Sequence, residues 1–435
     1  MTIFFRQIRY KLLGGFLVRP LIFAIALGVA GALLSHLEEW VPPMNAWIPT
    51  ILFPSRSDPD MARLIFSTIA SAMMTVVSIV FAILLMTLTL ASMQFSPRII
   101  TNFIEDRVTQ YTLGIFLGTF GYCIAAIPAV RSSPPPFVPI LTVTGAMLLA
   151  FICSCCLLFF INHISEAISA SHIVDRLASQ TLRMIDELMP PDLGQIRAKL
   201  PANPNTYLNQ TPILSNRSGY IRFIDTKQLL SFAQLHQTDI QVVRRVGHYV
   251  PMGIPLFVLS SDREITKAIR NDFRSAFDFG PTRTLQQDVE FGILKIVDIA
   301  LKAISPAVND PSTAITCVDH LSAILIHFAS RHPPDDVLTD TDGKVFVSIP
   351  WLDFERLVDS AFEQIRMYSR TDVAVSLRIF RALADIAHTV PKLATRKLLA
   401  DRGRRILAGC AKSLEENEIV EMRRRMSVLE TLAGN

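Results

Sequence analysis

The sequence has few charged residues, and they are unevenly distributed. Only 18% of the 435 residues are Asp, Glu, Lys or Arg, whereas soluble domains average about 25%. Residues 1–162 contain 15 charged residues, and the remaining 273 residues contain 65. The deficit therefore belongs to the N-terminal part, as is typical of a membrane domain, while the C-terminal part has the charge content of a soluble domain. This distribution excludes a disordered chain and a wholly soluble protein.

Cysteine is also scarce, with six residues in the chain. Cys153, Cys155 and Cys156 lie within an apolar run where thiolates would be costly, which argues against a metal site. The spacing of the six predicts no disulfide framework. The residues after position 162 have a net charge of only +1, so we expect no nucleic-acid partner. We predict no cofactor and no bound metal.

Long uncharged runs predict an α-helical membrane domain with four transmembrane helices. The runs cover residues 16–34, 64–92, 111–130 and 137–161, and about 20 apolar residues suffice to cross a bilayer. Lys and Arg are enriched before the first run and in the loop at 94–110, which predicts that the N-terminus and the C-terminal region face the cytoplasm. In the third run, Gly114, Gly118 and Gly121 predict a close contact with another helix.

The second run is unusually long and has one patterned face. Between Arg63 and Arg98 there are 34 residues without a formal charge, or about 51 Å of helix against a hydrocarbon core of about 30 Å. Small and hydroxyl-bearing residues recur at steps of three and four, which places them on one face. This face comprises Ser71, Thr75, Ser78, Ala82, Leu85, Thr89 and Ser92. It predicts either tight helix packing or the lining of a hydrated path in which Leu85 forms an apolar constriction.

The C-terminal part predicts a cytoplasmic α+β region in three segments. A helical stalk with a Pro/Asn-rich linker covers residues 163–204, a small β-rich module covers 205–262, and a helical domain covers 263–435. The phrase from Gly247 to Leu256 resembles a turn of the small lipoyl- and biotinyl-type barrels. This phrase favours a β-barrel-like module, to which we assign no prosthetic group.

Polar residues gather between positions 283 and 313 in otherwise apolar sequence. Asp310 followed by Pro311 is typical of a helix N-cap, but capping does not explain the other members. We consider either a buried hydrogen-bonded network or a ligand or ion site. The candidates are Arg283, Gln287, Asp288, Asp298, Asn309, Asp310 and Thr313. No catalytic residue is assigned, because the sequence lacks HExxH, GxSxG, Walker and GxGxxG motifs.

Two phrases resemble a known family. One is Gln94-Phe-Ser-Pro-Arg98 with the following Asp106 and Gln110, and the other runs from Phe291-Gly292 through Asp298 to Ala314. They resemble the bacterial family of predicted membrane proteins numbered 2254 among the domains of unknown function, over about residues 10–430. The resemblance implies an integral inner-membrane protein with a large cytoplasmic portion and implies no reaction. The motif expected at the membrane exit comprises Gln94, Ser96, Pro97, Arg98, Asp106 and Gln110.

These observations lead to two main hypotheses of function. The first is a homo-oligomeric ion channel or transporter in which the second membrane helix lines the path. The second is a membrane-anchored cytoplasmic sensor or scaffold that binds a protein or a small molecule. For the second, the last helix offers an apolar stripe for self-association, formed by Ile419, Met422, Met426 and Leu429. An enzyme acting near Asp288, Asp298 and Asp310 is a third alternative. The expected partners are the lipid bilayer and further copies of the chain, and the sequence identifies no ion or ligand.

Overall fold

The computed structural model describes residues 18–41, 58–94, 106–133, 136–167, 169–189, 210–331, 337–339 and 346–434. The chain divides into two compact units, Met1–Ser169 and Ala170–Asn435. Each unit has its own buried apolar clusters. The units are described separately below.

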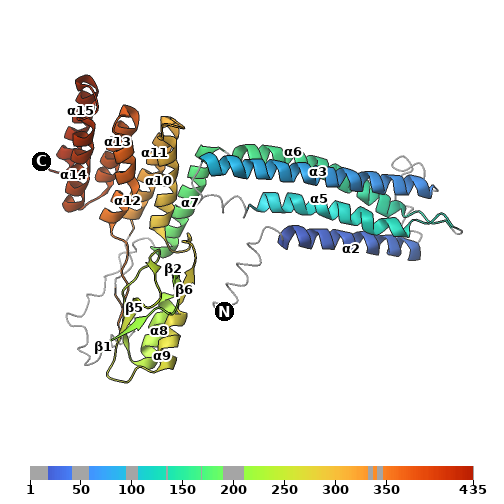
Figure 1. Cartoon of the computed structure of the whole chain (residues 1–435), viewed down its shortest axis with the longest axis horizontal. Coiled ribbons are helices and arrows are strands. Elements are labelled where there is room, and N and C mark those ends of the chain that lie inside the picture. Colours follow the sequence, from blue (N-terminus) through green and yellow to red (C-terminus); the bar gives the residue numbers. More distant parts are fainter. Residues whose placement is uncertain are drawn as a thin grey trace. The chain divides into compact units, whose positions relative to one another are not determined.

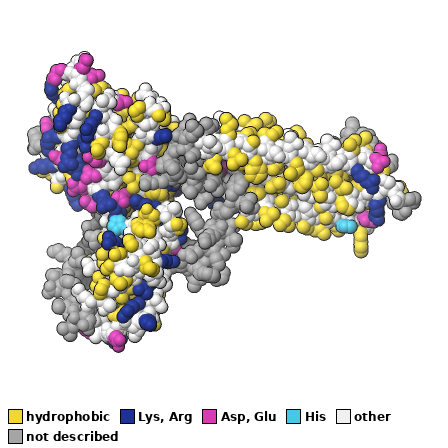
Figure 2. Space-filling model, viewed as in Figure 1, with side chains coloured by type: hydrophobic (Ala, Val, Ile, Leu, Met, Phe, Trp, Pro, Cys, Tyr) yellow, Lys and Arg dark blue, Asp and Glu magenta, His cyan; other side chains and the backbone are white. Residues whose placement is uncertain are grey.

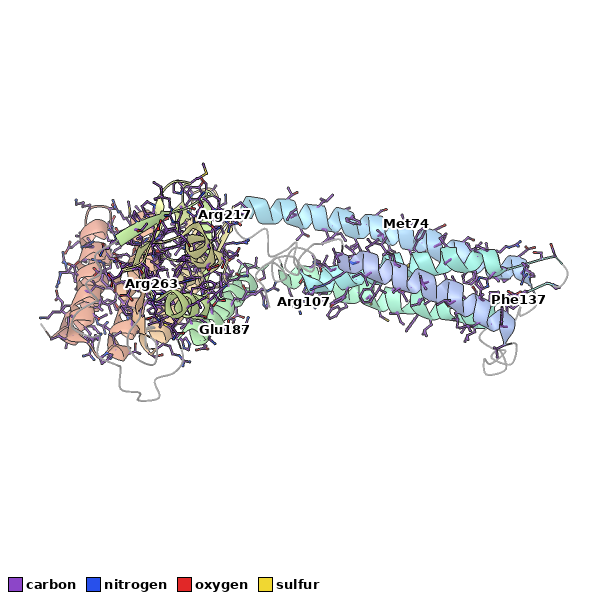
Figure 3. The ribbon with its side chains drawn as sticks, turned by 90° about the horizontal axis from the view of Figure 1, so that it is seen from below. Met74, Arg107, Phe137, Glu187, Arg217 and Arg263 are labelled. Carbon is purple, nitrogen blue, oxygen red and sulfur yellow. The ribbon has the colours of Figure 1, made fainter. Side chains whose placement is uncertain are left out.

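The first unit is a bundle of four long helices, drawn side by side in Figure 1. They are α2 (Val18–Trp40), α3 (Pro59–Gln94), α5 (Arg107–Ala126) and α6 (Ile140–Ala167), with a short 3₁₀ helix, η2 (Ile127–Ala129), after α5. Helix α5 contacts α2, α3 and α6. Arg107 and Phe137 lie at opposite ends of the bundle (Figure 3). The four uncharged runs of the sequence thus each form a helix, and all four helices are long and apolar enough to cross a membrane.

Helices α2 and α5 approach closely because glycines lie between them. A Cβ at Gly118 would lie 2.4 Å from the Leu27 side chain, and a Cβ at Gly114 would lie 3.0 Å from Phe23. On α2, a Cβ at Gly31 would lie 2.6 Å from the Tyr122 carbonyl oxygen. Small residues permit this approach of two backbones. The predicted glycine contact of the third run is therefore confirmed, with α2 as the partner.

At the end of the bundle where α2 ends and α6 begins, a carboxylate of α2 caps α6. Glu38 of α2 is 1% exposed. Its Oε1 accepts the N–H of Leu141 at 2.7 Å, and its Oε2 accepts the N–H and the hydroxyl of Thr142 at 3.1 and 3.0 Å. The first N–H groups of a helix have no partner within the helix. Glu38 supplies one for α6 and thereby fixes the end of α2 against it.

The second unit contains a layered series of helices, seen as neighbouring ribbons in Figure 1. Its long helices are α7 (Ala170–Leu188), α10 (Val289–Ala303), α11 (Pro311–Ala329), α12 (Phe354–Tyr368), α13 (Val373–Thr389), α14 (Leu393–Cys410) and α15 (Glu416–Leu432). Helix α7 packs against α10 and α11 through a buried face that includes Val174, Leu177 and Ile185. Residues 170–188 of the predicted stalk therefore pack within the helical unit.

The remaining elements of the second unit form two β-sheets with two helices. They are β1 (Gln210–Leu214), β2 (Gly219–Ile224), α8 (Thr226–His236), β3 (Asp239–Val242), β4 (Tyr249–Val250), β5 (Pro255–Ser260), α9 (Lys267–Ser275), β6 (Phe277–Gly280), β7 (Val337–Thr339) and β8 (Phe346–Ser348). One sheet has the order β1-β5-β3-β8-β7 and the other β4-β2-β6. All pairs are antiparallel except β3 with β8.

This β region differs from the predicted small module in its extent. The prediction ended the module at residue 262 and did not include the helix α8. The structure adds α9 and β6, and it brings β7 and β8 from the later insert onto β3. Phe257, Phe273 and Phe277 are buried in its shared core. The α+β character of the region is confirmed.

A fifth helix is also long and apolar enough to cross a membrane. Helix α11 has a mean hydropathy of 1.3, below the 1.6 to 2.5 of the four bundle helices. It packs against α7, α10 and α13, and its Asp319 forms an ion pair with Arg378 of α13. Its apolar composition is explained by a position in the core of the helical unit, where Leu321, Ile324 and Leu325 are fully buried.

Candidate functional site

The patterned face of α3 points away from the bundle. Ser71, Thr75, Ser78, Ala82, Leu85 and Thr89 are all exposed, and the side chain of Ser92 lies outside the described residues. The packed face instead consists of Phe66, Ala70, Met73, Val77 and Val80. At about 100° per residue, the two faces lie on opposite sides of the helix. Packing among the described residues of one chain therefore does not explain the small residues.

The hydroxyl groups on this face are bound to the helix itself. Thr75 donates to the carbonyl of Ser71 at 3.1 Å, Ser78 to that of Met74 at 2.9 Å, and Thr89 to that of Leu85 at 2.8 Å. Serine and threonine commonly bond back to the carbonyl four residues earlier. These donors are satisfied, so the face tolerates an apolar environment, while the oxygen lone pairs remain free to accept.

The outward faces of neighbouring helices have a different composition. Helix α2 exposes Leu21, Ile25, Val29 and Leu33, and α6 exposes Leu148, Phe151, Leu158 and Phe159. Figure 2 shows hydrophobic and uncharged side chains over most of the visible side of the first unit, with charged side chains at one end. Large aliphatic and aromatic side chains are what a lipid-facing helix surface carries. Helix α3 also exposes large residues, among them Ile79 and Met86. What distinguishes it is the row of small and hydroxyl-bearing residues that recurs beside them at steps of three and four.

The residues predicted at the membrane exit are only partly within the described structure. Ser96, Pro97 and Arg98 lie outside it, and Gln94 is the last residue of α3. Asp106 caps α5, accepting the N–H and the hydroxyl of Thr109 at 2.9 and 2.8 Å. His163 of α6 lies 3.0 Å from the same carboxylate oxygen. Gln110 accepts from Arg19 of α2 at 3.1 Å. These contacts join α2, α5 and α6 at one end of the bundle.

Three of the seven predicted polar-cluster residues meet at the start of α10. Asp288 caps the helix through the N–H of Phe291 at 3.0 Å and receives two bonds from Arg283, at 2.7 and 2.8 Å. Gln287 bonds to both the N–H and the carbonyl of Ile224 in β2, at 2.9 and 3.1 Å. The cluster therefore connects α10 with the β region, and Asp288 is 2% exposed.

Gly247 allows the turn before β4 to pass directly over Asp288 and Arg283. Its φ of +87° lies in the left-handed region, which glycine adopts without strain. A Cβ at this position would lie 2.4 Å from Asp288 Oδ2 and 2.9 Å from Arg283 Nη2. The glycine of the barrel-like phrase thus has a packing role against the polar cluster.

The most highly connected residue of the site, Glu290, was not singled out from the sequence. It is 5% exposed. Its Oε2 accepts from Arg245 and Arg283, each at 3.1 Å, and its Oε1 accepts from Arg356 at 2.8 Å. Burial raises the pKa of Glu290, but the bonds and charges of Arg356 and Arg245 outweigh it and lower the pKa to about 2. Only its place beside Phe291-Gly292 in the family phrase hinted at a role.

The other predicted cluster residues lie elsewhere. Asp310 caps α11 through the N–H of Thr313 at 3.1 Å and the Thr313 hydroxyl at 2.5 Å, and Asn309 precedes it with a φ of +51°. Helix α10, with 15 residues and hence about 22 Å long, separates this cap from Asp288, and Asp298 lies within that helix. The predicted N-cap is confirmed, but the seven candidates do not form one site.

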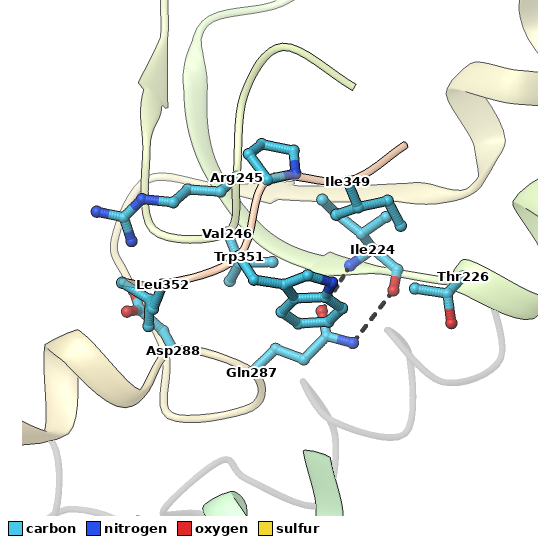
Figure 4. A pocket seen from close by; sticks show the side chains of 10 residues that line it. Ile224, Thr226, Arg245, Val246, Gln287, Asp288, Ile349, Trp351 and Leu352 are labelled. Atoms are coloured by element: carbon cyan, nitrogen blue, oxygen red, sulfur yellow. Dashed lines mark hydrogen bonds between the residues drawn. The ribbon is translucent and has the colours of Figure 1, made fainter. Parts of the chain in front are cut away.

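A small cavity lies beside the polar cluster (Figure 4). It has a volume of about 30 Å³ and is lined by Ile224, Thr226, Arg245, Val246, Gln287, Asp288, Ile349, Pro350, Trp351 and Leu352. That volume holds about two waters. Nearby, the pKa of His248 is lowered by burial and by Arg245, Arg356 and Arg244, while Glu290 acts against this. Burial and the three arginines thus outweigh Glu290 in their effect on His248.

The apolar stripe of the last helix is already covered. Ile419, Met422, Met426 and Leu429 are each 4% exposed or less, and α15 packs against α13 and α14. The expectation that this stripe is available for self-association is therefore wrong, because it completes the core of the helical unit.

Comparison with known proteins assigns the chain to a family. The DUF2254 family, described as predicted membrane proteins, matches residues 14–385. The chain belongs to this family. It is 33% identical over 373 residues to an uncharacterised protein of Mycobacterium tuberculosis, and 32% identical over 373 residues to an uncharacterised protein of Mycobacterium bovis. Each alignment covers 84% of this chain and 70% of the relative. No solved structure matches.

Membership confirms the resemblance carried by the two phrases and establishes that this DUF2254 chain is a predicted membrane protein. Of the phrases, Asp106, Gln110, Phe291 and Gly292 have defined roles in the structure. A Cβ at Gly292 would lie 2.3 Å from the Thr181 hydroxyl oxygen, so this glycine lets α10 pack against α7. These contacts join neighbouring helices, and by themselves they imply no reaction.

Proposed function

We propose that this DUF2254 protein is a homo-oligomeric ion channel or transporter of the bacterial inner membrane, with α3 from each copy lining the path. The observation that carries the proposal is the exposed face of small and hydroxyl-bearing residues on α3. Small residues let a second helix approach closely, so the row of serine, threonine and alanine side chains on α3 is suited to meet further copies.

In the proposed topology α2, α3, α5 and α6 cross the membrane, and the N-terminus and residues 170–435 are cytoplasmic. The distribution of Lys and Arg supports this orientation. The ion pair of Asp319 with Arg378 supports placing α11 outside the bilayer, because charged side chains are costly there. The 36 residues of α3 form about 54 Å of helix, which exceeds the hydrocarbon core and allows the helix to continue beyond it.

Replacing Leu85 by serine tests whether α3 lines the path. Leu85 is the one large residue on the patterned face and is 64% exposed. In the proposed assembly it forms the apolar constriction, so Leu85→Ser is expected to raise the rate of ion flux through purified protein in liposomes. Leu148→Ser, at a position 60% exposed on α6, is the matched control and is expected to leave the rate unchanged. Equal flux for both variants, or no flux in any form of the protein, would count against the proposal.

A membrane-anchored sensor is the second candidate function. The small cavity lined by Arg245, Gln287 and Asp288 supports it, because these side chains offer donors and acceptors to a ligand that the second unit would report. The two functions are compatible if ligand binding to the second unit controls ion flux along the path lined by α3. They differ because a channel or transporter carries an ion flux and a sensor alone does not.

A further inference from the structure

Two turns of the β region are bonded together and form one surface. One turn connects β1 with β2, and the other connects β4 with β5. Gly253 donates its N–H to the carbonyl of Ser215 at 2.9 Å, and Met252 donates its N–H to the Ser218 hydroxyl at 2.9 Å. These bonds hold the two turns next to each other. We call this surface the β tip; it comprises residues 214–218 and 249–254.

The β tip exposes large apolar and aromatic side chains. Met252 is 67% exposed, Tyr249 is 53% exposed and Leu214 is 43% exposed. The Tyr249 ring packs edge-on against Tyr220, with the ring centres 5.2 Å apart. A Cβ at Gly253 would meet no atom within 4 Å, so the turn beside Met252 projects from its surroundings. A single exposed apolar residue is ordinary on a protein surface, but here three gather on two turns.

The charge at the β tip is positive. Residues 210–224 and 240–261 contain four arginines and no Asp or Glu, and two of the four pair with carboxylates elsewhere in the second unit. Arg217 is exposed and lies over the Phe279 ring, 4.9 Å from its centre. Arg274 donates to the carbonyl at the end of β1 at 2.7 Å. Within the described part of the chain, neither Arg217 nor Arg274 forms an ion pair.

We propose that the β tip docks onto a bilayer surface that carries anionic lipid headgroups. Arginines are attracted to such a surface, tyrosine rings are enriched at the membrane–water interface, and exposed Met and Leu side chains leave water when they enter it. The positive charge of Arg217 and Arg274 complements the negative charge of the headgroups.

The connection between the two units keeps a bilayer within reach of the β tip. Helix α7 begins at Ala170, three residues after α6 ends at Ala167, so a bilayer that holds α6 lies close to the second unit. The inference rests on the proposed membrane topology and does not depend on whether α3 lines a path.

A fluorescent label at position 252 tests the contact. Cys155 and Cys156 are replaced by alanine, and because the other four cysteines are buried, Met252→Cys supplies the accessible thiol. The full chain, labelled there with the environment-sensitive fluorophore NBD, is placed in nanodiscs of phosphatidylcholine with or without phosphatidylglycerol. With phosphatidylglycerol we expect stronger emission at shorter wavelength, because the label leaves water, and quenching by lipids with brominated acyl chains. Val420→Cys, at a position 57% exposed on α15, is the matched labelling control and is expected to show neither effect.

Replacing Arg217 separates docking by charge from simple partitioning of the label into lipid. The attraction of one basic residue to an anionic surface corresponds to about a fivefold change in an equilibrium constant. Arg217→Gln is therefore expected to lower the ratio of docked to undocked label about fivefold, and Arg217→Lys to retain most of the docking. Arg423→Gln, at a position 56% exposed on α15, removes one charge elsewhere and is expected to dock as the parent does. High salt is expected to weaken docking of the parent.

Three outcomes would overturn the inference. The first is emission that is the same with and without phosphatidylglycerol, and the second is an Arg217→Gln protein that responds as the parent does. The third is a change that brominated lipids do not quench, which indicates contact with protein, such as a second copy of the chain. None of these measurements depends on ion flux, so a failure of docking and a failure of the proposed path along α3 are distinguishable.

Discussion

Replacing Glu290 by glutamine is expected to lower the free energy of unfolding of the second unit by about 3 kcal/mol at pH 7. Removing one partner of a buried ion pair typically costs 3–5 kcal/mol, because the remaining charges stay buried without compensation. Here three arginines lose the negative charge that they share, and one of the two accepting oxygens becomes a donating NH₂ group. The measurement is denaturant unfolding of the full chain in detergent, followed by Trp351 fluorescence. Glu430→Gln removes a surface ion pair with Arg404 and is expected to cost less than about 1 kcal/mol.

The difference in stability between the parent and Glu290→Gln is also expected to depend on pH. The pKa of Glu290 is about 2 in the folded state against an ordinary value of 4.5, so its ionised form is favoured by folding. The resulting stability is present above pH 4.5 and is lost as the pH falls toward 2. The difference between the parent and Glu290→Gln should therefore shrink across this window. A difference that stays constant from pH 7 to pH 2 would show that the charge of Glu290 is not what stabilises the cluster.

Replacing Gly31 by alanine is expected to destabilise the helix bundle by about 1–3 kcal/mol, the usual cost of inserting atoms into a packed core. The new Cβ would lie 2.6 Å from the Tyr122 carbonyl oxygen and 3.0 Å from its Cα. These are backbone atoms, so α2 and α5 must separate to make room. Titration of the purified protein with SDS in mixed micelles measures the loss.

Gly28 on the same helix provides the control. A Cβ there would lie 3.6 Å from the Gly121 carbonyl oxygen, an ordinary van der Waals contact. Gly28→Ala is therefore expected to be neutral or slightly stabilising, because alanine favours helix over glycine. If Gly28→Ala and Gly31→Ala lost stability equally, the close α2–α5 approach at Gly31 would be wrong.

The helices of the first unit could be predicted because their signal is local. An uncharged run of apolar residues requires a helix in a bilayer whatever its neighbours are, and each of the four predicted runs forms one. Helix caps were predictable for the same reason, since Asp310 and Pro311 are adjacent in the sequence. The direction of the α3 faces was not predictable, because only the positions of α5 and α6 determine which side is packed.

The Glu290 cluster could not be predicted because its members are distant in the sequence. Arg245 lies 45 positions before Glu290, and Arg356 lies 66 positions after it. Each arginine alone resembles an ordinary surface residue. Helix α8 was missed for a different reason. It has 11 residues with only Leu229 and Ala233 buried, so the surrounding strand patterns dominated, although Asp225 was a valid N-cap signal.

Cysteine cross-linking on α3 tests the central claim of a homo-oligomer most directly. In a background with Cys155 and Cys156 replaced by alanine, Ser78→Cys is introduced on the patterned face, and Val29→Cys serves as the control on the outward face of α2. Both parent residues are exposed within one chain. After oxidation in native membranes, we expect disulfide-linked dimers for Ser78→Cys and monomers for Val29→Cys. Monomers for both variants would contradict the assembly, and with it a path lined by α3.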